Sequence, residues 1–87
     1  MLKHIVLFKI IRPEVNLSSV TSFFNTLPRI KEVHHFNLKQ NDDCILLYAE
    51  FESKEALKKY MEHEIHISVK RNTEFFIEEK QVFDFWV

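Results

Sequence analysis

The sequence contains no glycine among its 87 residues, and this absence removes several classes of site. A phosphate-binding P-loop, a dinucleotide fingerprint, an EF-hand loop and a nucleophile elbow all need glycine where the backbone turns sharply or approaches a ligand. The only cysteine, Cys44, has no partner for an intrachain disulfide. A zinc site built mainly from cysteines needs several of them, so this class of site is excluded as well. We therefore expect a cytoplasmic protein without these cofactors.

A strong charge of one sign and long apolar runs are also missing. The formal net charge is −1, which argues against nucleic acid and against an anionic membrane surface as partners. The first apolar run, residues 5–8, ends at Lys9 and is too short for a signal peptide or a membrane span. The chain is 46% hydrophobic and has nine phenylalanines, so we expect residues 1–87 to fold as one domain.

Sequence patterns predict four strands and two helices. Pro13 is expected to close the first strand, Asn16 or Ser18 to cap the first helix, and Pro28 to end it. Ser53 is expected to cap the second helix. A less regular helical stretch is expected to follow it, as far as about residue 77, and the turn is placed at residues 41–43. The expected strands are residues 3–11, 33–39, 44–51 and 81–87.

The order of these elements is β-α-β-β-α-β, a ferredoxin-like α+β fold with an antiparallel four-stranded sheet. The expected strands at residues 5–8 and 44–51 are apolar on both faces, whereas a sheet with one wet face alternates apolar and polar residues. Two helices cover only one face of four strands. We therefore expect a second copy of the chain to cover the other face, giving a homodimer.

Tyrosine and histidine are the residue types in this chain most suited to acid–base chemistry or to ligand binding. Tyr60, His63 and His66 lie close together at the end of the second helical pattern, and His4 lies at the start of the first apolar run. Histidine exchanges protons near neutral pH, and a tyrosine hydroxyl both donates and accepts a hydrogen bond. These four residues are the candidate ligand-binding site. No carboxylate completes a metal site with the histidines, so no metal is expected.

Three segments carry a resemblance to a known family: residues 3–9, residues 49–57 leading to Tyr60, and residues 82–85 after the His63-x-x-His66 pair. With these segments the chain resembles the stress-responsive dimeric α/β barrel domain family, over nearly its whole length. The resemblance implies two ferredoxin-like protomers packed sheet to sheet into a barrel. A plant polyketide cyclase of this family implies His66 and Tyr60 as an acid–base pair and His4 as a pocket-lining residue.

The course of the chain after His63 stays open. Family members usually have proline at the next position, where this chain has Glu64, so the sequence leaves undecided whether the helix breaks there. In an unbroken helix, Tyr60 and His66 would point about 120° apart. The two residues would converge on one pocket only if the helix bends.

Each candidate residue also has a structural interpretation. Tyr60 has the spacing of a core residue, His66 is placed to bond a backbone carbonyl, and His63 is placed to favour the helix dipole. Three function classes therefore remain. The favoured one is a homodimer that binds a small apolar or aromatic molecule between helix and sheet. The alternatives are a cofactor-free cyclase-like enzyme using His66 and Tyr60, and an interaction protein whose pocket is filled by its own phenylalanines.

Overall fold

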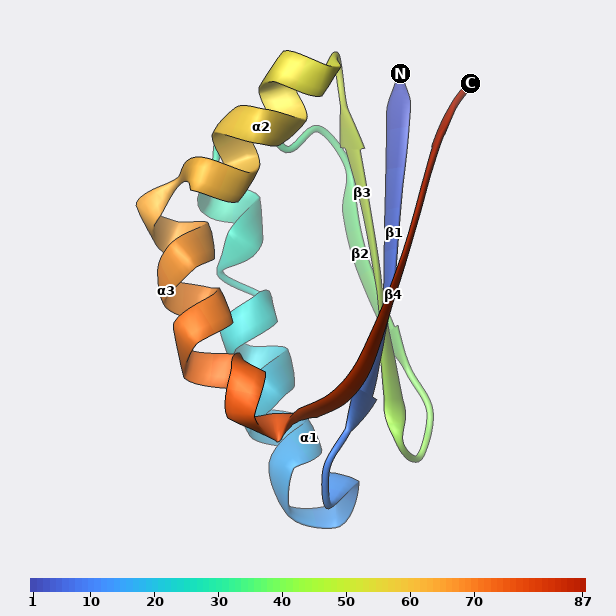
Figure 1. Cartoon of the computed structure of the whole chain (residues 1–87), viewed down its shortest axis with the longest axis vertical. Helices are drawn as coiled ribbons and strands as arrows, with labels where there is room; N and C mark the ends of the chain where they lie inside the picture. Colours follow the sequence, from blue (N-terminus) through green and yellow to red (C-terminus); the bar gives the residue numbers. More distant parts are fainter.

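A computed structural model describes all residues 1–87 as a four-stranded antiparallel sheet with helices on one face. Figure 1 shows the sheet edge-on, with every helix on one side and no element on the other. The sheet order is β2-β3-β1-β4, so the first and last strands lie side by side. The elements in chain order are β1 (Leu2–Ile10), α1 (Pro13–Phe24), η1 (Leu27–Arg29), β2 (Phe36–Gln40), β3 (Cys44–Phe51), α2 (Lys54–Glu62), α3 (Glu64–Thr73), η2 (Glu74–Phe76) and β4 (Ile77–Trp86).

The ferredoxin-like α+β prediction is confirmed, with one difference in the second helical region. There the structure has two helices, α2 and α3, in place of one helix with an irregular extension. The strand expected at residues 44–51 is β3 at the same bounds. The predicted cap of α2 is also confirmed, since the Ser53 hydroxyl accepts a hydrogen bond from the backbone N–H of Ala56 at 3.0 Å.

The turn before β3 is made without glycine. The side-chain oxygen of Asn41 accepts hydrogen bonds from the backbone N–H groups of Asp43 at 3.1 Å and Cys44 at 2.8 Å. An asparagine side chain can thus replace a backbone acceptor and fix the turn. The predicted turn at residues 41–43 is confirmed.

The predicted start of the first helix was wrong. Pro13 begins α1 instead of only closing the strand, because proline lacks the N–H that the first helical turn leaves unbonded and has its φ angle preset for a helix. The preceding Arg12 has φ 48° and is the only residue with positive φ. Asn16 does not cap the helix; its side-chain amide donates to the carbonyl of Ile11 at 2.6 Å.

Other boundaries also differ from the prediction. α1 ends at Phe24, before Pro28, which instead lies inside the short helix η1. β2 begins at Phe36, so the exposed His34 and His35 precede it. β4 begins four residues earlier than expected, at Ile77, because its first residues are mostly charged and give no strand pattern.

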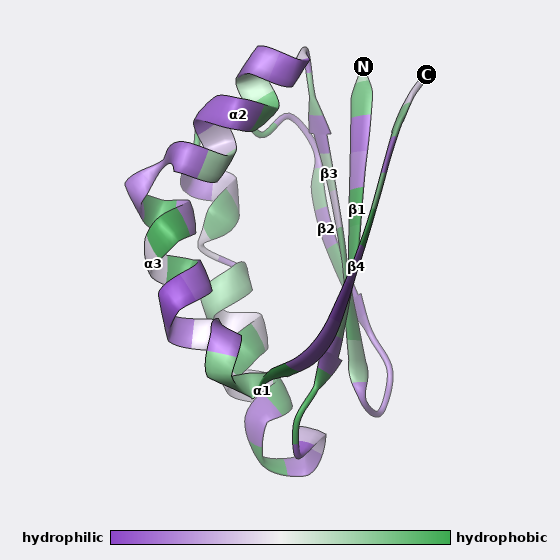
Figure 2. Ribbon diagram, in the orientation of Figure 1, coloured by the Kyte–Doolittle hydropathy of each residue, from purple (hydrophilic) through white to green (hydrophobic).

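The core lies between the helices and the sheet. The buried side chains on β1 are at even positions and those on β3 at odd positions, as expected for strands with one face against the helices. In Figure 2, α2 is mostly hydrophilic, whereas the strands carry hydrophobic stretches. None of the helices has the length and hydropathy that crossing a bilayer requires. The buried apolar residues are Leu2, Val6, Phe8, Ile10, Val20, Phe24, Leu27, Ile30, Ile45, Leu47, Ala49, Phe51, Tyr60 and Val69.

The other face of the sheet has no helix over it and is also largely apolar. Phe83 and Phe85 of β4 lie on this face with ring centroids 5.6 Å apart, and their strand partners are Ile5 and Lys3. Phe83 is 65% exposed. We call this surface the open face; its apolar side chains are Ile5, Leu7, Leu46, Tyr48, Phe83 and Phe85.

Candidate functional site

A cavity of about 210 Å³ lies between the sheet and helices α2 and α3. Its wall contains side chains from every layer of the fold, including His4 from β1, Tyr60 from α2 and His66 from α3. Phe8 and Phe24 line the cavity but leave it unfilled. The remaining lining residues are Val6, Leu27, Leu47, Met61, Val69, Lys70, Thr73, Glu74, Ile77, Lys80 and Val82.

His63 separates α2 from α3 and lets Tyr60 and His66 meet. Its backbone is extended, with ψ 143°, and its ring nitrogen Nδ1 accepts a hydrogen bond from the backbone N–H of Ile65 at 3.0 Å. A cap side chain that accepts a hydrogen bond from the backbone N–H of the second residue after it has the geometry of a helix N-cap. The chain therefore breaks without proline, because the imidazole replaces the carbonyl that a continuous helix would supply.

The break brings three of the four candidate residues together. The rings of Tyr60 and His66 have centroids 4.8 Å apart at an interplanar angle of 65°, and the ring of His4 lies 6.1 Å from that of Tyr60. His63 was also expected at the ligand site, but it does not line the cavity, because its imidazole is committed to capping α3. The half-buried His63 thus has a structural role: it places Tyr60 and His66 beside each other.

Tyr60 is a core residue with its hydroxyl on the cavity. The residue is 1% exposed, and no protein group bonds its hydroxyl, yet the structure contains no buried polar side-chain atom without a partner. The hydroxyl oxygen must therefore be accessible from the cavity. Burial raises the pKa of Tyr60 far above its ordinary value, so the hydroxyl stays protonated and can donate a hydrogen bond.

His66 is also unpaired. The pKa of its imidazole is lowered to about 4; burial is the largest cause, and the nearby His4, Lys70 and Lys80 add to it because positive charge disfavours a second cation. At neutral pH the ring is therefore uncharged, with one donor and one acceptor nitrogen. The predicted hydrogen bond from His66 to a backbone carbonyl is absent, which leaves the ring nitrogens for a ligand or water.

His4 is fixed by a residue that the sequence analysis did not include in the site. Its Nδ1 lies 2.6 Å from the Oδ1 of Asp84, its neighbour across β1 and β4. A carboxylate at Nδ1 holds the imidazole in one orientation and keeps the hydrogen on that nitrogen. The signal that could have revealed this pair is the lone acidic residue within the apolar segment 82–87.

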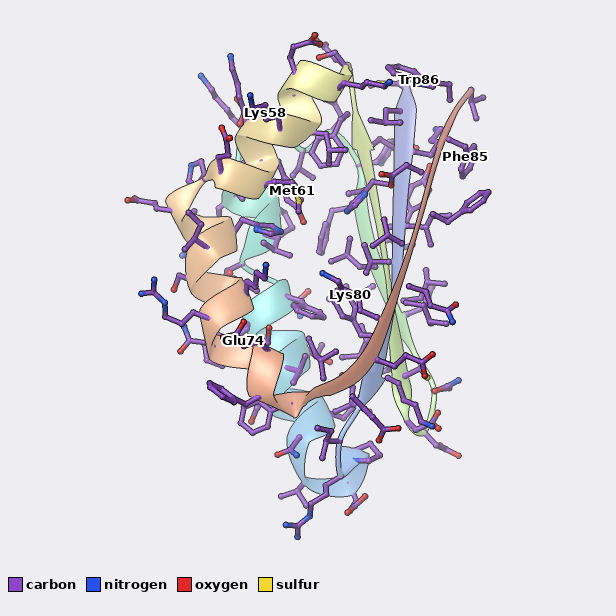
Figure 3. The ribbon with its side chains drawn as sticks, viewed as in Figure 1. Lys58, Met61, Glu74, Lys80, Phe85 and Trp86 are labelled. Carbon is purple, nitrogen blue, oxygen red and sulfur yellow. The ribbon has the colours of Figure 1, made fainter.

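Two lysines were also missed. Lys70 of α3 and Lys80 of β4 line the cavity, and Figure 3 shows Lys80 extending from β4 into the space between the sheet and the helices. Neither residue lies in an apolar pattern, so no sequence signal distinguishes it from the other lysines. No group of three or more histidine, cysteine, aspartate or glutamate side chains is arranged to hold a metal ion.

The profile of the family described as "Stress responsive A/B Barrel Domain" matches residues 2–87. No curated relative matches the sequence.

Several solved structures share the fold along almost the whole chain. A dimeric protein of unknown function with a ferredoxin-like fold from Bacteroides fragilis has 26% identity and a TM-score of 0.84, covering 99% of this chain and 95% of its own. A putative antibiotic biosynthesis monooxygenase from Nitrosomonas europaea has 12% identity and a TM-score of 0.85, covering 100% and 98%. A protein from Arabidopsis thaliana has 19% identity and a TM-score of 0.82, covering 100% and 95%.

Proposed function

Since the chain belongs to the stress-responsive A/B barrel domain family, we propose that it is a homodimer whose protomers each bind one small apolar or aromatic molecule between helices and sheet. The main support for a bound ligand is the cavity itself. Its walls are mainly apolar, and Tyr60 and His66 present polar groups to it that have no protein partner. A site with apolar walls and a few convergent polar groups is the usual form of a small-molecule pocket.

The size of the cavity limits the ligand. An apolar cavity of about 150 Å³ accepts benzene, and pockets for drug-sized molecules are larger than about 300 Å³. The volume of about 210 Å³ therefore suits a molecule with one or two rings. The Tyr60 hydroxyl would donate a hydrogen bond to an oxygen of such a molecule, and the neutral His66 would donate or accept one.

Filling the cavity tests this proposal. A 2-naphthol titration followed by calorimetry should give saturable binding to the wild type. Val69→Phe places a larger side chain on the cavity wall and should abolish the binding, whereas Val15→Phe, at a position that is 60% exposed on α1, should leave it unchanged. Tyr60→Phe and His66→Ala should each weaken binding while the circular dichroism spectrum is kept. Equal binding by the wild type and Val69→Phe would remove the cavity as the site.

The homodimer is supported by the open face. Single exposed apolar residues are normal, but Ile5, Leu7 and Phe83 form a continuous apolar surface over two neighbouring strands. The similar protein from Bacteroides fragilis is described as dimeric. A twofold axis through the open face would pack the open face of one protomer against the open face of its partner, as in most closed dimers. Light scattering at low micromolar concentration should give twice the mass of 10.6 kDa.

The second candidate function is a cofactor-free acid–base enzyme, and the contact between the Tyr60 and His66 rings favours it. In this mechanism the protonated Tyr60 hydroxyl polarises a carbonyl of the substrate, and the neutral His66 removes a proton. With a pKa of about 4, His66 is unprotonated at neutral pH and can accept a proton. Its affinity for the proton is low, so His66 would be an inefficient general base. Catalysis requires that His66→Ala abolishes turnover while ligand binding persists.

The cellular location that we propose rests on Cys44. Cys44 is unpaired and only partly buried, and burial together with the neighbouring Asp43 raises the pKa of its thiol. We propose that the protein works in the reducing cytoplasm, where such a thiol persists. Labelling of Cys44 in intact and lysed cells with a membrane-impermeant thiol reagent tests this, because a cytoplasmic thiol reacts only after lysis.

A further inference from the structure

Two lysines give the cavity lining positive charge. Lys70 of α3 and Lys80 of β4 both line the cavity, and both residues are exposed. Neither ammonium group is neutralised, because the ion pairs of the structure involve only Lys3, His4, Lys9 and His34. Two unpaired cations on the wall of one cavity attract a ligand of negative charge.

The rest of the lining is mainly apolar. It includes the buried Phe8, Phe24 and Leu27, and Phe8 is the cross-strand neighbour of Lys80. His66 is uncharged at neutral pH and His4 is paired with the Asp84 carboxylate, so the unbalanced positive charge comes from the lysines. Glu74 is the one acidic residue in the lining, and its carboxylate lies beyond ion-pair distance of both lysines, which leaves the lining with a net charge of +1.

We propose that the cavity binds a small aromatic carboxylate, with its ring against the phenylalanines and its carboxylate group between Lys70 and Lys80. This inference rests on the proposed function and adds the chemical class of the ligand. A single negative charge balances the net charge of +1 on the lining, whereas the two charges of a phosphate monoester would exceed it. Lysine suits this task, because its flexible stem carries a compact charge to the anion.

The inference is tested with two probes that share one ring system, 2-naphthoate and its neutral amide, 2-naphthamide. Calorimetry at pH 7.5 should show that the wild type binds 2-naphthoate roughly tenfold more tightly than 2-naphthamide. The preference should shrink about threefold in Lys70→Gln and in Lys80→Gln and disappear in the double variant. Added salt should reduce the preference as well, since the lysines are exposed to solvent.

Two further variants act as controls on charge. Glu74→Gln removes the opposing carboxylate and should tighten binding of 2-naphthoate about threefold, while binding of 2-naphthamide stays constant. Lys54→Gln removes an exposed lysine that does not line the cavity and should change neither affinity. A general effect of net charge would make Lys54→Gln behave like Lys80→Gln, and that result would overturn the inference.

The outcomes separate this inference from the proposed function. Equal affinity of the wild type for both probes would refute the carboxylate class but leave the small-molecule site in place. A preference that persists in the double lysine variant would also refute it. Failure of both probes to bind the wild type would remove the site and the inference together.

Discussion

The imidazole of His4 and the carboxylate of Asp84 are 80 residues apart in sequence, yet Nδ1 and Oδ1 lie 2.6 Å apart in the fold. The pair joins the first and last strands at a position where His4 is 6% exposed. It also fixes the ring that lines the cavity beside Tyr60. One contact therefore contributes to the stability of the sheet and to the shape of the site.

Asp84→Ala should lower the free energy of unfolding by about 1–3 kcal/mol, because it leaves a buried imidazole without its partner. Asp84→Asn keeps a side-chain oxygen that can accept the Nδ1 hydrogen and should recover part of this loss. The matched control is Asp42→Ala, in an exposed turn whose hydrogen bonds are made by Asn41. Urea denaturation measures all three, and equal stability of Asp84→Ala and Asp42→Ala would contradict the expectation.

Phe83→Glu should raise the dissociation constant of the homodimer on the order of 100-fold or more, since the twofold axis places two such carboxylates in one apolar interface. Phe75→Glu is the control. Phe75 is 80% exposed, comparable to the 65% of Phe83, but it lies in η2 outside the sheet. Sedimentation equilibrium should find the control dimeric. A dimeric Phe83→Glu variant would show that the open face is not the interface.

His66 should make the stability depend on pH between about 6.5 and 4. Its pKa is about 4 in the folded chain and 6.5 in the unfolded chain. As the pH falls through this range, the unfolded chain binds a proton that the folded chain does not, so the free energy of unfolding decreases. The shift would be worth about 3.4 kcal/mol for a fully buried group, and solvent screening of the partly buried His66 reduces this to on the order of 2 kcal/mol. Above pH 6.5 this contribution is complete, and below pH 4 it no longer changes.

Chemical denaturation at several pH values measures this contribution as the difference between wild type and His66→Gln, which should narrow as the pH falls. His34→Gln is the control, because His34 is 42% exposed and pairs only with Glu52 at the surface. The Glu50 carboxylate, whose pKa is lowered by hydrogen bonds from Lys3 and Tyr48, contributes at lower pH and is common to all variants. Parallel curves for wild type and His66→Gln would contradict the burial argument.

Arg12→Gly should raise the free energy of unfolding by about 1 kcal/mol. Arg12 has φ 48°, where a side chain with a Cβ atom is strained and glycine is not. Arg12 makes no ion pair, so little is lost with its side chain. Arg29→Gly, at the end of the helical turn η1, should instead destabilise the chain, because glycine has no advantage there. Thermal melting of the two variants in parallel distinguishes these opposite effects.

The sequence predicted the elements whose patterns are set by local chemistry. β3 has apolar residues on both faces, Ser53 directly precedes a helical pattern, and the Asn41 side chain can bond the backbone of its own turn. The strand, the helix cap and the turn were therefore all predicted correctly. The start of α1 was missed because proline both closes strands and begins helices. The first part of β4 was missed because Glu78, Glu79 and Lys80 are all exposed at the sheet edge and show no alternation.

The site was predictable only in part for a related reason. Tyr60, His66 and His4 were selected by residue type and by resemblance, whereas their contacts depend on the break at His63, which no glycine or proline marks. Lys70 and Lys80 are 10 residues apart in sequence and lie on different elements, and only the placement of α3 over the sheet brings them to the same cavity. Asp84 can bond His4 only because β1 and β4, the first and last strands, pair in the sheet.

The two faces of β4 constrain how this chain can change over evolutionary time. Lys80 and Val82 face the cavity. The alternate residues Gln81, Phe83 and Phe85 face the opposite side of the sheet. Inserting or deleting one residue in this strand would exchange the two sets, moving the phenylalanines toward the helices and the lysine toward the open face. Descendants of this chain can therefore vary the side chains of β4 one at a time, but they should keep its length, and length changes should collect in loops such as residues 41–43.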